Sequence, residues 1–154
     1  MIGRYACFVV GLVGLLIVAP VAMAQTQLAP GAPLRLVLKG YDPVAYFTEG
    51  KPVPGKPEFE AVFDEARYRF ASAQHLEQFK ADPDHYAPQY AGSCASAMAA
   101  GYKVEAEPEN WLIIDGKLFV FAGPGGPDKM RANTAEVIAK GRENWKTLDK
   151  GPSR

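Results

Sequence analysis

Trp111-Leu112-Ile113-Ile114-Asp115-Gly116-Lys117-Leu118-Phe119-Val120-Phe121 is the stretch that says most about the fold of this chain. Two apolar runs flank the dipeptide Asp115-Gly116, and Asp-Gly between apolar runs is typical of a two-residue β-hairpin turn. The pattern therefore predicts two antiparallel strands joined at Asp115-Gly116.

A second hairpin is predicted upstream of this one. Phe59, Ala61 and Phe63 recur at every second position, which is the spacing of one face of a strand. Asp64-Glu65-Ala66 then turns the chain, and Tyr68-Arg69-Phe70 forms the returning strand. The segment 34–38 alternates weakly and predicts one further short strand.

The first predicted helix follows the upstream hairpin. Ser72 is a good N-cap, and Leu76 and Phe79 come after it at helical spacing. This helix should end before Asp82-Pro83, because a residue that precedes proline disfavours the helical region. Residues 84–92 predict an irregular connection. Asp42, Asp82 and Asp84 all lie near prolines, and each is expected to have a turn or capping role.

A second short helix is predicted over residues 93–100. These residues are small apart from Cys94 and Met98, and Gly101 is suited to the C-cap. A helix of small residues can pack very close to its neighbours.

The third predicted helix starts at Asp128 and carries Met130, Val137, Ile138 and Trp145. We expect Trp111 and Trp145 to pack the downstream hairpin and this helix onto each other. Taken together, the elements predict an α+β fold, in which a small antiparallel sheet made from β-hairpins packs against about three short helices.

The first residues of the chain predict export. Arg4 precedes an apolar run from Ala6 to Ala19, and Ala22-Met23-Ala24 provides small residues for a signal peptidase. We therefore expect residues 1–24 to be a cleaved signal peptide and the protein to be periplasmic or secreted. The apolar run is shorter than the roughly 20 residues of a spanning helix, so no stable membrane anchor is expected after cleavage. Residues 25–35 should form a flexible leader, 36–148 the folded domain and 149–154 a C-terminal tail.

Charge and cysteine content narrow the function of the mature chain. Without residues 1–24 it has 16 basic and 17 acidic residues, and this balance argues against nucleic-acid binding. Of the two cysteines, Cys7 leaves with the signal peptide, so Cys94 is a lone thiol in an oxidising compartment. Cys94 is therefore buried and inert, paired with another chain, or used as a ligand or a nucleophile.

Several segments together resemble the exported YHS-domain proteins. They are Gly40-Tyr41-Asp42-Pro43-Val44-Ala45-Tyr46-Phe47, Tyr68-Arg69-Phe70-Ala71-Ser72, residues 82–90, the stretch around Cys94 and the hairpin at Asp115-Gly116. The resemblance runs from about Leu36 to Trp145 and implies the YHS-like domain fold. It also implies metal binding, with copper as the leading metal, through family motifs that contain three cysteines. Here Ala45 and Ala71 replace the first two, and His75 stands in the place of the third.

The residues themselves offer a different set of soft-metal ligands. Cys94 and Met98 are four residues apart and would share one face of a helix. Thiolate and thioether sulfurs select Cu(I), and imidazole is an acceptable third donor. His75 and His85 are the two histidines of the chain, and both flank the first predicted helix. We therefore predict a candidate copper site of Cys94, Met98, His75 and His85 in a non-catalytic binding module.

Three other interpretations remain open. Cys94 and Met98 also suit a packed core, in which case the protein is a structural or partner-binding module. In such a module Tyr41, Tyr46, Tyr86 and Tyr90 could form a binding surface, or they could pack in the core with their hydroxyls hydrogen-bonded. A cysteine-dependent enzyme would need a histidine base beside Cys94. We do not expect an enzyme, because the sequence contains no hydrolase, zinc-protease or phosphate-binding motif.

Overall fold

The downstream hairpin is present as predicted in the computed structural model, which describes residues 33–148. Strand β4 (Glu107–Ile114) pairs antiparallel with β5 (Lys117–Phe121), and Ile114 lies opposite Lys117. Asp115 and Gly116 have φ values of 50° and 69°, the left-handed backbone that this turn requires. The predicted signal peptide, the tail at 149–154 and most of the predicted leader lie outside the described residues.

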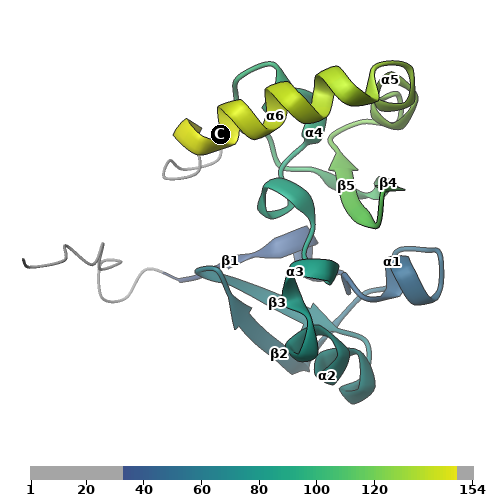
Figure 1. Ribbon diagram of the computed structural model, residues 1–154. Helices are drawn as coiled ribbons and strands as arrows, with labels where there is room; N and C mark the ends of the chain where they lie inside the picture. Colours follow the sequence, from purple (N-terminus) through teal and green to yellow (C-terminus); the bar gives the residue numbers. More distant parts are fainter. Residues whose placement is uncertain (1–32, 149–154) are drawn as a thin grey trace, which may run out of the picture. The chain divides into compact units, whose positions relative to one another are not determined.

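The upstream hairpin is also confirmed. Strand β2 (Lys56–Phe63) pairs antiparallel with β3 (Ala66–Phe70), and β1 (Arg35–Leu36) joins β3 in parallel on its other side. The sheet order is β1-β3-β2, so β2 is an edge strand. Because Arg35 belongs to β1, regular structure begins one residue inside the predicted leader. The two hairpins belong to two separate sheets rather than to one (Figure 1).

The first strand of each hairpin contains a proline beside a break in register. In β2 the pairing shifts between Lys56 and Glu60, and Pro57 lies in the interval. In β4 the pairing shifts between Glu107 and Trp111, and Pro108 lies in the interval. Proline cannot donate a ladder hydrogen bond, so the regular pairing of both strands resumes only after it.

The first predicted helix is present as α2 (Ala73–Ala81), and the Ser72 side chain accepts a hydrogen bond from the His75 backbone N–H. The prediction of an irregular segment over 84–92 is wrong in its first part, where α3 (Pro83–Tyr86) forms. Asp82 caps α3 by accepting from the His85 N–H, and Pro83 stands in its first turn. Because of this cap and this proline, the segment that ends α2 also begins α3.

Two further short α-helices and two 3₁₀ segments complete the part of the chain before β4. Helix α1 (Ala45–Thr48) follows the turn at Asp42, and α4 (Ala95–Ala99) lies within the predicted segment 93–100. The 3₁₀ segments η1 (Val37–Gly40) and η2 (Gln89–Gly92) each contain two consecutive non-glycine residues with positive φ. In η2 these residues are Tyr90 and Ala91, which turn the chain sharply before α4.

The last predicted helix is two helices. Helix α5 (Gly126–Ala132) begins before Asp128, and α6 (Thr134–Leu148) follows after a break at Asn133, whose φ and ψ are −139° and 40°. Gly126 allows the early start because a Cβ at this position would lie 2.4 Å from the Cβ of Phe121. The apolar spacing that predicted one helix continued across the break and gave no sign of it.

One continuous core joins these elements. Its largest fully buried side chains come from α1, α2 and both sheets: Tyr46, Tyr68, Phe70, Phe79 and Phe121. The two tryptophans pack in different places, contrary to expectation, because Trp111 meets Tyr46 edge to face and Trp145 meets Tyr90. The α+β fold class is confirmed, with two small sheets and helices packed against them.

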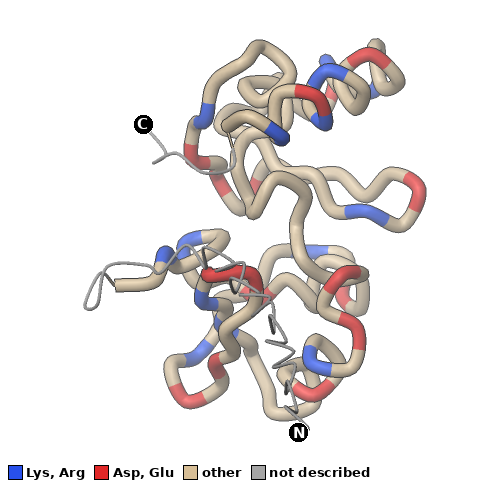
Figure 2. Tube along the Cα trace, turned by 60° about the vertical axis from the view of Figure 1, so that its left-hand side comes forward, with Lys and Arg blue, Asp and Glu red and all other residues tan. Residues whose placement is uncertain are grey.

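Basic and acidic residues are interspersed along the trace (Figure 2). The ion pairs on α2, α5 and α6 are local pairs three or four residues apart, on exposed faces. Such pairs solvate the surface and add little to stability. Within residues 33–148, none of the helices combines the length and the apolar character that a bilayer crossing requires.

Candidate functional site

Cys94 and Met98 lie one helical turn apart, as their spacing suggested. Cys94 is the N-cap of α4, and its carbonyl accepts a hydrogen bond from the Met98 N–H at 2.9 Å. The Cys94 N–H in turn donates to the carbonyl of Val104 at 2.8 Å. Cys94 is 6% exposed and Met98 is fully buried, and both belong to the core. The pair is thus packed in the interior of the protein.

His75 is held by a carboxylate from a distant part of the chain. Its Nδ1 lies 2.7 Å from Oδ2 of Asp42, and its Nε2 lies 3.5 Å from Oγ1 of Thr48. The Asp42 side chain is fully buried and also accepts hydrogen bonds from the N–H groups of Val44 and Ala71. A carboxylate at Nδ1 fixes the orientation of the ring, which is the arrangement common behind metal-bound histidines.

His85 lies against the same short helix as His75. Its ring centroid is 4.8 Å from that of Phe47 and 4.7 Å from that of Tyr86. Phe47 and Thr48 are neighbours on α1, so α1 contacts both histidines. Cys94 and Met98 instead belong to α4, where Asn144 of α6 donates to the Met98 carbonyl. The four predicted ligands thus form two pairs. His75 and His85 both contact α1, whereas Cys94 and Met98 both belong to α4.

Clusters of the commonest metal-ligating residue types would be a further kind of metal site in the described part of the chain. Across residues 33–148, no three His, Cys, Asp or Glu side chains form a group that could hold a metal ion. That finding concerns clusters of these four residue types and leaves aside the Met98 thioether. The site of Cys94, Met98, His75 and His85 stays a prediction.

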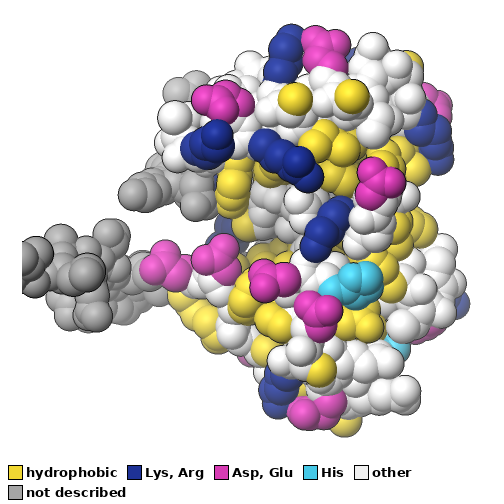
Figure 3. Space-filling view, in the orientation of Figure 1, with side chains coloured by type: hydrophobic (Ala, Val, Ile, Leu, Met, Phe, Trp, Pro, Cys, Tyr) yellow, Lys and Arg dark blue, Asp and Glu magenta, His cyan; other side chains and the backbone are white. Residues whose placement is uncertain are grey.

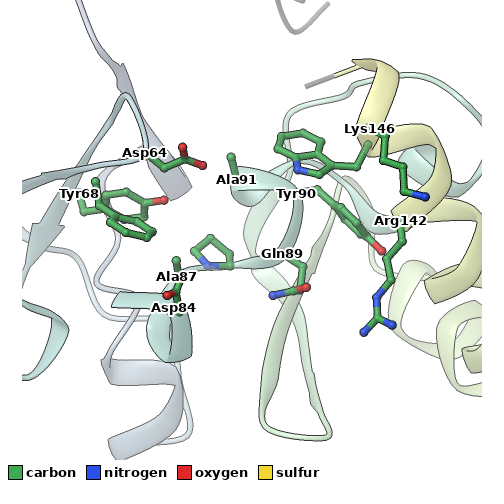
Figure 4. A pocket seen from close by; sticks show the side chains of 12 residues that line it. Asp64, Tyr68, Asp84, Ala87, Gln89, Tyr90, Ala91, Arg142 and Lys146 are labelled. Carbon is green, nitrogen blue, oxygen red and sulfur yellow. The ribbon is translucent and has the colours of Figure 1, made fainter. Parts of the chain in front are cut away.

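A cavity that the sequence did not indicate lies elsewhere in the fold. It has a volume of about 480 Å³ and is open to solvent. Three segments line it: the β2–β3 turn region, the stretch from α3 through η2, and α6. Figure 4 shows Asp64 and Tyr68 on one side of the cavity and Arg142 and Lys146 on the other.

Aromatic side chains form much of the cavity wall. Tyr68 and Tyr90 are only 2% and 6% exposed, and both contribute to the lining. The ring centroids of Tyr90 and Trp145 are 6.0 Å apart, which places the indole beside the Tyr90 ring. Phe63 continues the apolar wall on the side of Tyr68. Tyr68 and Tyr90 therefore expose little of their rings, and the partly buried Phe63 and Trp145 provide the accessible aromatic surface.

Burial changes the acidity of both tyrosines. It raises the pKa of Tyr68 from 10.0 to about 12. Burial also raises the pKa of Tyr90, while the nearby charge of Arg142 partly opposes this shift. Both phenols are therefore neutral at physiological pH and act as hydrogen-bonding groups with apolar rings.

Charged side chains of opposite sign complete the lining. Asp64 and Asp84 contribute carboxylates, and α6 contributes Arg142 and Lys146, one turn apart. Lys146 contacts Glu143 at 3.1 Å. Within the part of the chain that the structure describes, Arg142, Asp64 and Asp84 make no side-chain ion pair. Figure 3 shows a face of the molecule on which hydrophobic side chains lie between basic and acidic ones.

No protein family, curated protein or solved structure that was compared with this chain matches it.

The four tyrosines considered from the sequence all lie in the core or pack against it. Tyr46 fits the core interpretation, because it is 1% exposed and its hydroxyl donates to the Pro108 carbonyl at 3.0 Å. Tyr90 lines the cavity, and its buried hydroxyl has no hydrogen-bond partner among the described residues. Tyr41 and Tyr86 are partly buried and pack against the core.

Proposed function

We propose that this protein is a non-catalytic binding module that takes a small organic ligand into the cavity beside Tyr68 and Tyr90. The observation that carries the proposal is the combination of volume and lining. A space of about 480 Å³ is within the usual range for ligand sites, which are mostly apolar with a few polar groups. Here rigid aromatic rings form the wall, and charged groups stand on two sides of it.

The lining offers charged and hydrogen-bonding groups that suit a bound ligand. It contains carboxylates, cations and phenols, but no histidine, cysteine or serine. Covalent catalysis by Cys94 would need a base beside an accessible thiolate, and Cys94 is 6% exposed in the core. The role of a binding module agrees with the resemblance to exported YHS-domain proteins and with the signal peptide expected at residues 1–24.

Ligand-observed and protein-observed NMR would test this function. We expect small aromatic compounds, screened against the mature chain (residues 25–154), to shift the resonances of Tyr68, Tyr90 and Trp145. Ala87→Trp places a large ring in the cavity and should weaken the best hits at least tenfold. Ala122→Trp is the matched control, since Ala122 is exposed and does not line the cavity. A library without hits at these residues, or an Ala87→Trp variant that binds as tightly as the parent, would contradict the proposal.

Soft-metal binding, with copper as the leading metal, is the second candidate. One observation favours it: the buried Asp42 carboxylate contacts Nδ1 of His75, an arrangement common behind metal-bound histidines, and a metal at Nε2 would replace the long contact with Thr48 Oγ1. Cys94 and Met98 would bring sulfur donors that suit Cu(I). Their burial equally supports the structural alternative, in which Cys94 is inert.

A competitive Cu(I) titration of the reduced mature chain distinguishes metal binding from a purely structural role of Cys94. Metal binding predicts one-to-one affinity that falls sharply in Cys94→Ala and Met98→Leu. Met130→Leu is the control, because Met130 is as deeply buried as Met98 and lies on α5. Equal affinity in all variants would remove Cys94 and Met98 from the site, and His75→Gln would then be tested. Absence of binding in the parent would favour the structural role of Cys94.

A further inference from the structure

Three charged side chains of the cavity lining make no ion pair within residues 33–148, namely Arg142, Asp64 and Asp84. Most lysines and arginines on α5 and α6 have a carboxylate three or four residues away, as in Arg131 with Asp128 and Lys140 with Glu136. Arg142 lacks such a pair within residues 33–148, and so do Asp64 and Asp84. These three charges share one cavity although they come from three separate segments.

Among the lining residues the sign of the charge changes from one side of the cavity to the other, while Lys117 and Arg35 contact the backbone carbonyls of Asp84 and Ala91 at its edge. Arg142 and Lys146 project from α6, and Asp64 lies across the cavity from them beside Tyr68 (Figure 4). Asp84 adds a second carboxylate from α3. A ligand that carries only an anion would be attracted by Arg142 and repelled by the two carboxylates. A ligand that carries only a cation would be attracted by the two carboxylates and repelled by Arg142 and Lys146.

Aromatic surface occupies the space between these charges. Tyr68 and Tyr90 are held almost completely buried, and Trp145 lies beside Tyr90. Rigid rings bind flat apolar groups at a low cost in conformational entropy, and they prefer offset or edge-on contact with a second ring. In Figure 4 the Tyr68 hydroxyl points into the cavity, where it provides one hydrogen-bonding group.

We propose that the cavity selects a zwitterion with an aromatic body, of the amino-acid or short-peptide type. The carboxylate lies toward Arg142 and Lys146, the ammonium group lies toward Asp64 and Asp84, and the side chain rests on Phe63 and Trp145. This inference rests on the proposed function, since it names the ligand class of the same cavity. The charged groups are exposed, so they contribute more to selectivity than to affinity.

Calorimetry with a matched series of probes tests the ligand class. L-Phenylalanine carries both charges, 3-phenylpropionate only the anion, and phenethylamine only the cation. We expect the mature chain to bind L-phenylalanine, or the longer zwitterion L-phenylalanyl-L-phenylalanine, at least tenfold more tightly than either singly charged probe. The better of the two zwitterions then distinguishes a free amino acid from a peptide. Equal binding of all probes would overturn the inference.

Variants assign the two ends of the ligand. Arg142→Gln should remove the preference for the zwitterion over phenethylamine, and Asp84→Asn should reduce its preference over 3-phenylpropionate. Lys140→Gln, on α6 but outside the lining, should change neither ratio. Unchanged ratios in the first two variants would contradict the assignment of these charges.

Two failures are distinguishable. If neutral aromatic fragments occupy the cavity and no zwitterion is preferred, the ligand class is wrong and the binding function stands. If neither fragments nor zwitterions shift the resonances of Tyr68, Tyr90 and Trp145, both the ligand class and the proposed function fail.

Discussion

Asp42 connects three parts of the chain through one fully buried carboxylate. Oδ1 accepts from the Val44 N–H at 2.8 Å, and Oδ2 accepts from the Ala71 N–H at 2.7 Å while it contacts His75 Nδ1. These contacts fix the start of α1, the end of β3 and the first turn of α2. Every oxygen of the side chain is therefore occupied as an acceptor.

The first prediction concerns this carboxylate. In Asp42→Asn an amide NH₂ must replace one oxygen and then faces an N–H donor, so at least one buried donor loses its partner. We expect the free energy of unfolding to fall by about 2–4 kcal/mol, measured by urea denaturation. Asp128→Asn, at an exposed position on α5, is the control and should change stability little. A stable Asp42→Asn variant would show that the carboxylate is not the link described here.

The second prediction is a pH dependence that originates at Tyr68. Burial raises the pKa of Tyr68 to about 12, above the 10.0 of an exposed tyrosine, so folding favours the neutral phenol. This contribution is fully present below pH 10 and is lost as the pH rises through 12, because the unfolded chain ionises first. The shift corresponds to on the order of 2 kcal/mol.

Denaturation midpoints at several values between pH 9 and pH 12 would measure the effect. Tyr68→Phe should lose less stability over this interval than the parent protein. Tyr102→Phe is the matched control, since Tyr102 is 51% exposed. Parallel pH profiles for Tyr68→Phe and the parent would refute the assignment to Tyr68.

The sequence anticipated local roles of single residues better than distant ones. Ser72 caps α2 as expected, and the short-range bond from Asp42 to Val44 fits the predicted turn role. The bonds from Asp42 to Ala71 and His75 join residues 29 and 33 positions apart. No periodicity or capping rule reports such a separation, because both describe neighbours along the chain.

At the scale of elements, turn chemistry was more informative than helical spacing. The upstream hairpin was predicted from alternation and the turn at Asp64-Glu65-Ala66. The downstream hairpin was predicted from the apolar runs that flank Asp115-Gly116, and both hairpins are present. The break between α5 and α6 was missed because the apolar positions continue across Asn133. Asn133 has a non-helical backbone that its residue type permits but does not require.

Helix α6 supplies the third prediction, at Gly141. A Cβ there would lie 2.4 Å from the Tyr90 hydroxyl oxygen and 2.7 Å from Cζ, and the buried ring has little room to move. Gly141→Ala should therefore destabilise the protein by about 1–3 kcal/mol through overpacking, although alanine is the better helix former. Thermal unfolding measures the change.

The control for this substitution is Gly123→Ala. No heavy atom lies within 4 Å of a Cβ built at Gly123, and its φ is outside the left-handed region. That variant should be close to the parent in stability. If Gly141→Ala were as stable as Gly123→Ala, the close approach of Tyr90 to α6 would not hold in solution.

At the scale of the whole molecule, one core joins both sheets and predicts one cooperative transition. Trp111 packs on Tyr46 and Trp145 on Tyr90, so the two indoles report on different parts of that core. In Trp111→Phe and in Trp145→Phe, the urea midpoint from the remaining tryptophan should equal that from far-ultraviolet circular dichroism. Midpoints that differ within one variant would show that parts of the core unfold separately.

The cavity is the feature that only the assembled fold reveals. Its lining comes from residues near positions 63–68, 84–91 and 142–146, which share no motif in the sequence. The sequence predicted a soft-metal site instead, because Cys94, Met98 and the histidines are residue types that bind soft metals. Their placement depends on which elements pack together, and spacing along the chain carries that information only within one helix.

The prolines of β2 and β4 have a consequence for self-association. Edge strands with an unbroken row of free backbone groups can recruit a strand from another molecule and begin an ordered aggregate. Pro57 and Pro108 each remove one backbone donor, and the shifts in register around them interrupt the row. The two strands of each hairpin can therefore pair with each other, whereas the outer edge of the hairpin is a poor template for a strand of another copy. This favours solubility of the folded chain at high concentration.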